Sequence, residues 1–349
     1  MLAFPSIPPL SAGAQAAAQA LQNTLTKPAG SLGQLEDLSV QLAAIAGKLR
    51  PALERKAVIV MAADHGVARE GVSAYPAEVT PQMVLNFLHG GAAINVLARQ
   101  AHARVIVVDI GVNAEFDPMP GLERRKIAYG TQNLLHGPAM TRTQAEEAIQ
   151  VGLQTVEQEY ARGLDVVATG DMGIGNTTPS AAICAVMTGL PVAQVTGRGT
   201  GVDNDGLARK IAAIERALAT NQPDRSDPLD VVSKIGGLEI AGLAGVIIGG
   251  AARHLPVVID GFISGAAALI AAGLVPAVKP YLIAAHQSVE IGHRAMLESL
   301  GLRPLLNLNL RLGEGTGAVL AFHLLDASVR ILNEMATFAG AGVSNKEAP

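Results

Sequence analysis

Residues 165–187 read DVVATGDMGIGNTTPSAAICAVM, and this stretch decides the fold. It opens with a short β-branched run, continues through a loop of glycine and polar residues from Gly170 to Thr178, and ends in an apolar helical segment. A continuous apolar run of this length is typical of a strand buried on both faces of a parallel sheet. A strand, a loop and a helix in this order form the first part of a βαβ unit.

The same pattern recurs along the chain after Lys56. Five further segments combine a short apolar run with a polar, glycine-containing end: AVIVMAADHG (57–66), RVIVVDIGVN (104–113), PVVIDGFIS (256–264), YLIAAHQS (281–288) and LLNLNLRLGEG (305–315). Helical stretches separate most of these runs. The sequence therefore predicts an α/β protein with a mostly parallel sheet flanked by helices.

Both ends of the chain are expected to be helical. An alanine-rich helix is predicted from residue 12, a second helix spans 34–49, and a long helix covers 321–335. We therefore expect residues 1–50 and 320–349 to form a small helical domain and residues 51–319 to form the large α/β catalytic domain.

The composition disfavours several classes of partner. Aromatic residues make up only 3% of the 349 residues and the net charge is −4, so neither a stacking platform nor a basic patch for nucleic acid is expected. The uncharged stretch 261–278 is glycine-rich and contains Pro276, which favours a buried element over a membrane span. The lone cysteine, Cys184, is interpreted as a buried structural thiol, and a single cysteine fits the reducing cytoplasm.

Polar residues gather where the predicted strands end. Asp, Glu, Asn, His or Ser stands beside glycine in nearly every one of these loops. Since the carboxyl ends of parallel strands form the usual ligand site of an open sheet, we expect an active site along this edge.

Two glycine-rich loops are candidates for anion binding. The loop 170–178 is followed directly by a helix, whose N-terminal amides and dipole favour a phosphate, although Thr177 or Thr178 could simply cap that helix. The loop 196–203 leads into a helix that bears Lys210, and on pattern alone a single lysine on a helix is usually a solvated charge.

The segment RLGEGTGA (311–318) places Glu314 between glycines. A glutamate in an apolar pocket has a raised pKa and can act as a general base. The alternative interpretation is a helix-capping glutamate in a surface turn, and spacing alone favours neither. Ser288 could donate to a phosphate; as a nucleophile it lacks the G-x-S-x-G elbow.

At these loops the sequence resembles the nicotinate-nucleotide:dimethylbenzimidazole phosphoribosyltransferase family (CobT). The matching segments follow the family's order along nearly the whole chain: KPAGSLGQLE, ADHGVAREGVSAYPAEVTPQMVLNF, GGAAINVLA, GDMGIGNTT, TGRGTGVD, PVVIDGFIS, AHQSVEIGH and LRLGEGTGA.

The resemblance implies transfer of ribose 5-phosphate from nicotinate mononucleotide to 5,6-dimethylbenzimidazole. The products would be nicotinate and α-ribazole 5′-phosphate, as in the assembly of the cobalamin nucleotide loop. It also implies a Rossmann-like fold, a homodimer, and a reaction that needs neither cofactor nor metal. Adenine or a phenol could replace dimethylbenzimidazole as the acceptor.

The resemblance further implies roles for individual residues. Glu314 would be the catalytic base, Gln82 would lie beside the benzimidazole, and Asp171 stands where the family motif has a glutamate one methylene longer. Lys210 and Ser288 would hold the phosphate. The substrate-binding loops would contribute Gly173, Gly175, Asn176, Thr177, Gly199 and Gly313.

Two rival functions are open to the same sequence. A nucleotide-dependent dehydrogenase would carry a G-x-G-x-x-G fingerprint after its first strand, but the sequence there reads AADHGVAREG. A non-catalytic binder of phosphoribosyl compounds or of benzimidazoles would bind without turnover and would not need Glu314.

Overall fold

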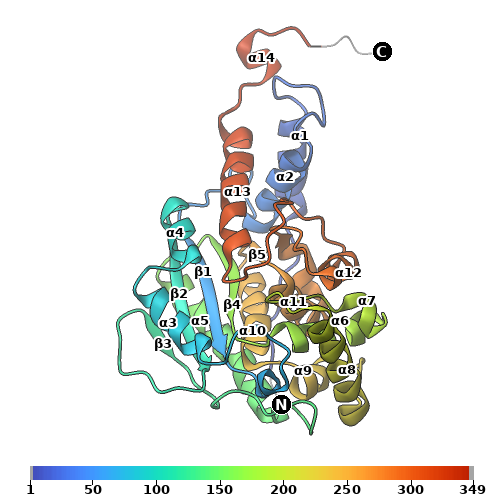
Figure 1. Cartoon of the computed structure of the whole chain (residues 1–349). Coiled ribbons are helices and arrows are strands. Elements are labelled where there is room, and N and C mark those ends of the chain that lie inside the picture. The colour runs from blue at the N-terminus through green and yellow to red at the C-terminus, as the bar shows by residue number, and fades with distance from the viewer. Residues whose placement is uncertain (1–2, 346–349) are drawn as a thin grey trace.

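The structure is a computed structural model that describes residues 3–345. Its centre is a six-stranded sheet in the order β3-β2-β1-β4-β5-β6, and every strand pair is parallel (Figure 1). This is the order of the doubly wound Rossmann fold. The strands are β1 (Lys56–Ala63), β2 (Ala103–Gly111), β3 (Leu122–Arg124), β4 (Val166–Met172), β5 (Val257–Ile259) and β6 (Leu282–Ala284). The predicted fold class is confirmed.

One predicted strand is wrong, and one strand of the structure was not predicted. The segment 305–310 makes only an isolated bridge, between Leu306 and His286, because Leu308 and its neighbours are exposed and no second layer covers them. The edge strand β3 was not predicted, because it is short, half-exposed and charged. Glu314 therefore follows an extended loop rather than a last strand.

Side chains alternate between the two faces of the sheet. In β1, Ala57, Ile59 and Met61 join the core cluster on one face, whereas Val58 and Val60 join the cluster on the other. All eight residues of β1 are buried. Fully burying a valine- or isoleucine-sized side chain contributes about 1.5–3 kcal/mol, so this strand anchors the loops at its ends firmly.

Helices cover both faces. The face of Ile59 packs against α5 (Arg142–Ala161), α6 (Thr177–Thr188), α9 (Pro228–Ile235), α10 (Leu238–Ala252), α11 (Phe262–Leu274) and α12 (Ile291–Leu300). The opposite face packs against α2 (Gln34–Ala46), α3 (Val79–Leu88), α4 (Ala93–Gln100) and α13 (Thr316–Glu334). The remaining helices are α1 (Ala12–Gln22), α7 (Val192–Val195), α8 (Asn204–Asn221), α14 (Phe338–Ala341) and the 3-10 helices η1 (Gly66–Glu70) and η2 (Pro276–Tyr281).

The two ends of the chain meet in one helical layer. Figure 1 shows α1 and α2 beside α13, and Ala18, Val40, Ala43 and Leu332 form a small core among them. The first part of α13 also packs on the sheet through Ala318 to Leu325. The boundaries 1–50, 51–319 and 320–349 stay a prediction, and residues 1–2 and 346–349 lie outside the described part of the chain.

Within residues 3–345, no helix is both long and apolar enough to cross a lipid bilayer. Cys184 is fully buried in α6, which confirms its interpretation as a structural thiol.

The carboxyl edge of the sheet gathers the polar loops. Asp64 follows β1, Asp171 is the next-to-last residue of β4, Asp260 follows β5, and His286 lies shortly after β6. The strand order reverses between β1 and β4, and ligands of doubly wound sheets bind at this switch point. The fold thus brings the predicted strand-end residues to one edge.

Candidate active site

A cavity at this edge collects most of the predicted site residues. It lies among the loops that follow β4, β5 and β6 and the loops 196–203 and 311–313. Six predicted residues line it: Asp171, Asn176, Thr177, Gly199, Ser288 and Gly313. Residues that are distant in sequence therefore share one small polar space.

Asp171 is the acidic group of this cavity. The Asn176 side-chain amide donates a hydrogen bond of 3.0 Å to Asp171 Oδ2. Burial raises the pKa of Asp171 well above its usual value, and the nearby carboxylates of Asp260 and Glu239 raise it further. A Cβ at Gly313 would come within 3.2 Å of Asp171 Oδ2, so the glycine lets the 311–313 loop approach the carboxyl group.

Lys210 is the buried cation of the site. It is fully buried in α8, and its Nζ donates to Thr177 Oγ1 at 2.7 Å and to the Gly197 carbonyl at 3.3 Å. Burial lowers the pKa of Lys210 to about 8, against the opposing effect of Glu290. The pattern-only interpretation of Lys210 as a solvated charge is wrong, because α8 packs its lysine face against the start of α6.

Glu290 ties two loops of the cavity together. Its Oε1 accepts a hydrogen bond of 2.8 Å from the Gly199 amide, and its own amide donates to Ser288 Oγ at 3.3 Å. The Ser288 amide donates to His293 Nδ1 at 2.9 Å, which fixes the backbone of this loop. The Ser288 hydroxyl oxygen accepts the hydrogen bond from the Glu290 amide, so its O–H group can still donate a hydrogen bond to a ligand.

Glu314 is buried beside the cavity, although it does not line it. The side chain is 5% exposed, and Oε2 accepts a hydrogen bond of 3.2 Å from the Ile94 amide in the first turn of α4. Glu314 therefore does cap a helix, but in the interior, so the surface-turn interpretation is wrong. Burial raises its pKa, the Asp260 carboxylate adds to this, and the Ile94 hydrogen bond opposes it.

The backbone at Glu314 is strained. Its φ is +62°, and Gly313 and Gly315 on either side also have positive φ values of 85° and 88°. A non-glycine residue in this conformation costs about 1–3 kcal/mol and persists only where the surroundings hold it, often at a functional site. A Cβ at Gly170 would lie 2.5 Å from the Glu314 carbonyl oxygen, so β4 supports this turn through direct backbone contact.

Most of the chain matches a model of one protein family. The profile of a phosphoribosyltransferase family (DBI_PRT) matches residues 7–343. The chain belongs to this phosphoribosyltransferase family.

Relatives of this phosphoribosyltransferase are similar over almost their full lengths. A protein of Chloroflexus aggregans (strain MD-66 / DSM 9485) is 62% identical over 98% of the chain and 97% of its own length. A protein of Roseiflexus sp. (strain RS-1) is 64% identical over 97% of the chain and 96% of its own length. Both are named nicotinate-nucleotide–dimethylbenzimidazole phosphoribosyltransferase. The crystal structure of CobT from Thermus thermophilus is 52% identical, covers 95% of this chain and 99% of its own, and superposes with a TM-score of 0.93.

Besides Lys210 and Glu314, three predicted residues of the phosphoribosyltransferase lie outside the cavity lining. Gln82 is exposed on α3, and Gly175 has a φ of 91° and faces Ala68. Gly173 packs on β1, where a Cβ would come within 2.4 Å of the Ala63 carbonyl oxygen. Both glycines shape the loop after β4, and Gln82 belongs to the helix that this loop holds in place, since the Ile174 amide donates to Thr80 Oγ1 at 3.1 Å.

Sequence reasoning missed other buried residues of the site. Asp260 directly follows β5 and His286 is the second residue after β6, so the strand-end rule that selected Asp171 could have found them. Glu290 carries no such signal, because a lone glutamate before a helix gives no indication of burial.

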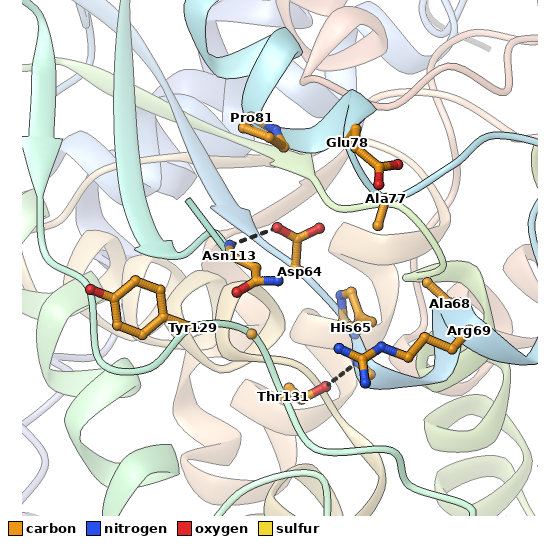
Figure 2. Close-up of a pocket in the computed structure, with 12 residues that line it drawn as sticks. Asp64, His65, Ala68, Arg69, Ala77, Glu78, Pro81, Asn113, Tyr129 and Thr131 are labelled. Atoms are coloured by element: carbon orange, nitrogen blue, oxygen red, sulfur yellow. Dashed lines mark hydrogen bonds between the residues drawn. The ribbon is translucent and has the colours of Figure 1, made fainter. Parts of the chain in front are cut away.

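A second cavity is lined by residues that follow β1 (Figure 2). Figure 2 shows Asp64, His65, Arg69 and Tyr129 around it, and Asp64 Oδ2 accepts a hydrogen bond of 2.7 Å from the Asn113 amide. His65 Nε2 is 2.8 Å from Glu239 Oε1, and neither side chain is exposed. This buried pair lies beneath the loop after β4 and supports it. Among residues 3–345, no group of three or more His, Cys, Asp or Glu side chains has a metal-binding arrangement.

Proposed function

We propose that this phosphoribosyltransferase transfers the ribose 5-phosphate group of nicotinate mononucleotide to 5,6-dimethylbenzimidazole. The products are nicotinate and α-ribazole 5′-phosphate, a precursor of the cobalamin nucleotide loop. The names of relatives that are 62–64% identical over nearly full length support this assignment. The observation that carries it is the buried Glu314, held next to a cavity with a buried lysine.

The phosphate end of the nucleotide belongs at the loops beside Lys210. Phosphate prefers a cation together with hydroxyl and amide donors, and helix N-termini supply such amides. Lys210, Thr177 at the start of α6, and Ser288 provide these groups around the cavity. The bound phosphate would replace the Thr177 hydroxyl and the Gly197 carbonyl as the hydrogen-bond partner of Lys210.

The reaction needs one base. A benzimidazole nitrogen uses its lone pair to form a bond with the anomeric carbon, and the ring's N–H proton passes to the carboxylate of Glu314. The bond from the anomeric carbon to the pyridinium nitrogen breaks, and its electron pair neutralises the departing ring. Because that ring is already cationic in the substrate, its departure needs little acid assistance.

The site supplies positioning and charge in addition to the base. Holding both rings about one sugar carbon lowers the barrier, because the reacting atoms no longer need to find each other. Positive charge develops on the sugar in the transition state, and Asp171 and Glu314 place carboxyl groups near it. Gln82, in the first part of α3, would border the benzimidazole, and Asp171 would reach the substrate directly or through a water molecule.

Turnover tests the proposal directly. The purified protein is incubated with nicotinate mononucleotide and dimethylbenzimidazole, and α-ribazole 5′-phosphate and nicotinate are measured by liquid chromatography with mass spectrometry. We expect both products in equal amounts, and none when either substrate is omitted. Tight binding of both substrates without any product would instead favour the non-catalytic binder.

We also propose that the protein works as a cytoplasmic homodimer. The single, buried Cys184 is compatible with a reducing compartment. Light scattering after size-exclusion chromatography gives the mass in solution, and a mass of about one chain would contradict the dimer.

A further inference from the structure

Asp260 holds the turn that carries Glu314. Its Oδ2 accepts a hydrogen bond of 3.2 Å from the Gly315 amide, and its Oδ1 accepts one of 2.9 Å from the Ala318 amide. Gly315 directly follows the strained Glu314, and Ala318 lies in the first turn of α13. One carboxylate therefore fastens the turn to the helix that follows it.

The carboxylate of Asp260 is itself fixed. It is 1% exposed, it directly follows the inner strand β5, and its amide donates to Thr169 Oγ1 on β4 at 3.2 Å. His286, in the loop after β6, places Nε2 3.6 Å from Asp260 Oδ1. Strands β4 and β5 and the loop after β6 thus hold Asp260 rigidly, and Asp260 transfers this rigidity to the Glu314 turn.

The turn is also held by a hydrogen bond of its own and by β4. The Thr316 amide donates to the Gly313 carbonyl at 3.1 Å, and a Cβ at Gly315 would lie 3.1 Å from the Thr169 carbonyl oxygen. Glycine adopts a positive φ readily, so Gly313 and Gly315 are unstrained, whereas Glu314 is held in a left-handed conformation that its side chain disfavours. In this conformation the Oε2 of Glu314 accepts the hydrogen bond from the Ile94 amide. Without the two hydrogen bonds to Asp260, the turn would lose its link to the loop after β5, and the strain at Glu314 would favour its relaxation.

We propose that Asp260 is a positioning residue for the reaction: by binding the Gly315 and Ala318 amides, it holds Glu314 in the conformation that aims its carboxylate at the acceptor base. This role rests on the proposed function of Glu314 as the base. Asp260 does not line the cavity, and it holds Glu314 in place through the turn.

Graded substitutions measure the role. Asp260→Ala removes both acceptors, and we expect kcat to fall about 100-fold, the loss that misplacing a catalytic group by about 1 Å can cause. Asp260→Asn keeps one acceptor oxygen, and we expect a smaller loss, about 10-fold. The KM for the nucleotide should stay within about 2-fold of wild type, because the phosphate loops are not touched.

Asp165→Ala is the matched control. Asp165 Oδ2 also accepts from two backbone amides, those of Glu54 and Arg55 at 3.1 and 2.9 Å, but at the amino end of β4, the opposite edge of the sheet. Its loss should lower the melting temperature and leave kcat unchanged.

The decisive experiment combines the Asp260 variants with Glu314→Gln. If Asp260 acts through Glu314, Asp260→Ala should lower kcat hardly at all in the Glu314→Gln background, so the two effects would be strongly non-additive. An equal fold-loss in both backgrounds would overturn the proposal. If Asp260→Ala fails to fold, the same cycle is run with Asp260→Asn.

A crystal structure of the Asp260 variant separates this proposal from the proposed function. We expect Glu314 to leave its positive φ and to lose its hydrogen bond to Ile94. An unmoved Glu314 would overturn the positioning role whether or not the wild-type protein makes α-ribazole 5′-phosphate. A wild-type protein without turnover would reject the function alone, and the variant structure would still decide the role of Asp260.

Discussion

Replacing Glu314 with glutamine removes a negative charge and leaves the shape of the side chain almost unchanged. The amide oxygen of glutamine can still accept the hydrogen bond that Glu314 Oε2 now accepts from Ile94 at 3.2 Å. What the variant cannot do is take a proton from the acceptor base. The substitution therefore tests the proton transfer and little else.

The expected loss of turnover is large and the expected loss of stability is small. A general base contributes about 10²–10⁴-fold, which is about 2.7–5.4 kcal/mol of barrier. Exchanging a charged acceptor for a neutral one weakens the Ile94 hydrogen bond by about 1 kcal/mol. Removing a buried charge close to Asp260 offsets part of that loss, since the pKa of Glu314 is raised by burial and by Asp260.

The assay follows α-ribazole 5′-phosphate over a range of pH for both proteins. Only the ionised Glu314 can accept a proton, so wild-type kcat should fall as the pH drops through its pKa, which lies above the ordinary 4.5. The variant should lose this acidic limb. Thermal unfolding and calorimetric binding of nicotinate mononucleotide serve as controls, and both should stay close to wild type.

Turnover of the Glu314→Gln protein within about 3-fold of wild type, far below the loss of a general base, would refute the reasoning. So would an unchanged acidic limb in the variant, because another group would then be the titrating base.

Other consequences of the structure can be measured in the same protein. Nucleotide affinity should fall as pH rises through about 8, where Lys210 loses its proton, and calorimetry should find no such step in Lys210→Met. Gly173→Ala should lower the free energy of unfolding, measured with urea, by about 1–3 kcal/mol, because its Cβ would meet the Ala63 carbonyl oxygen at 2.4 Å. Unchanged stability would contradict this packing. His65→Leu should lower the free energy of unfolding by about 3–5 kcal/mol, because Glu239 would remain buried without its partner at 2.8 Å; unchanged stability would contradict this pairing.

The sequence predicts the parts of the fold that are continuous and apolar. The runs of β1 and β4 are buried along nearly their whole length, so composition alone locates them. β3 is three residues long and half-exposed at the edge of the sheet, so its sequence resembles a loop. The alternating leucines of 305–310 look like a strand, but Leu308 is 54% exposed because no layer covers it.

From the residues alone, the site is most predictable where a polar side chain stands at the end of a strand. Asp171 satisfies this rule and lies at the cavity. The partners of the acidic residues come from distant segments: 220 residues separate Ile94 from Glu314, and 91 separate Gly199 from Glu290. Only the folded chain shows that these carboxylates are buried, and burial is what raises the pKa of Glu314.

The place of Glu314 in the chain bears on how the protein is made. A growing chain completes β6 at Ala284, yet it must add 30 more residues before it reaches Glu314. At ribosomal rates of about 5–20 residues per second, that interval is roughly 2–6 s. All six strands and Lys210 have been synthesised by then. Glu314 is thus the last of the predicted site residues to be synthesised, and α13, which follows it almost directly, packs against α2 near the start of the chain.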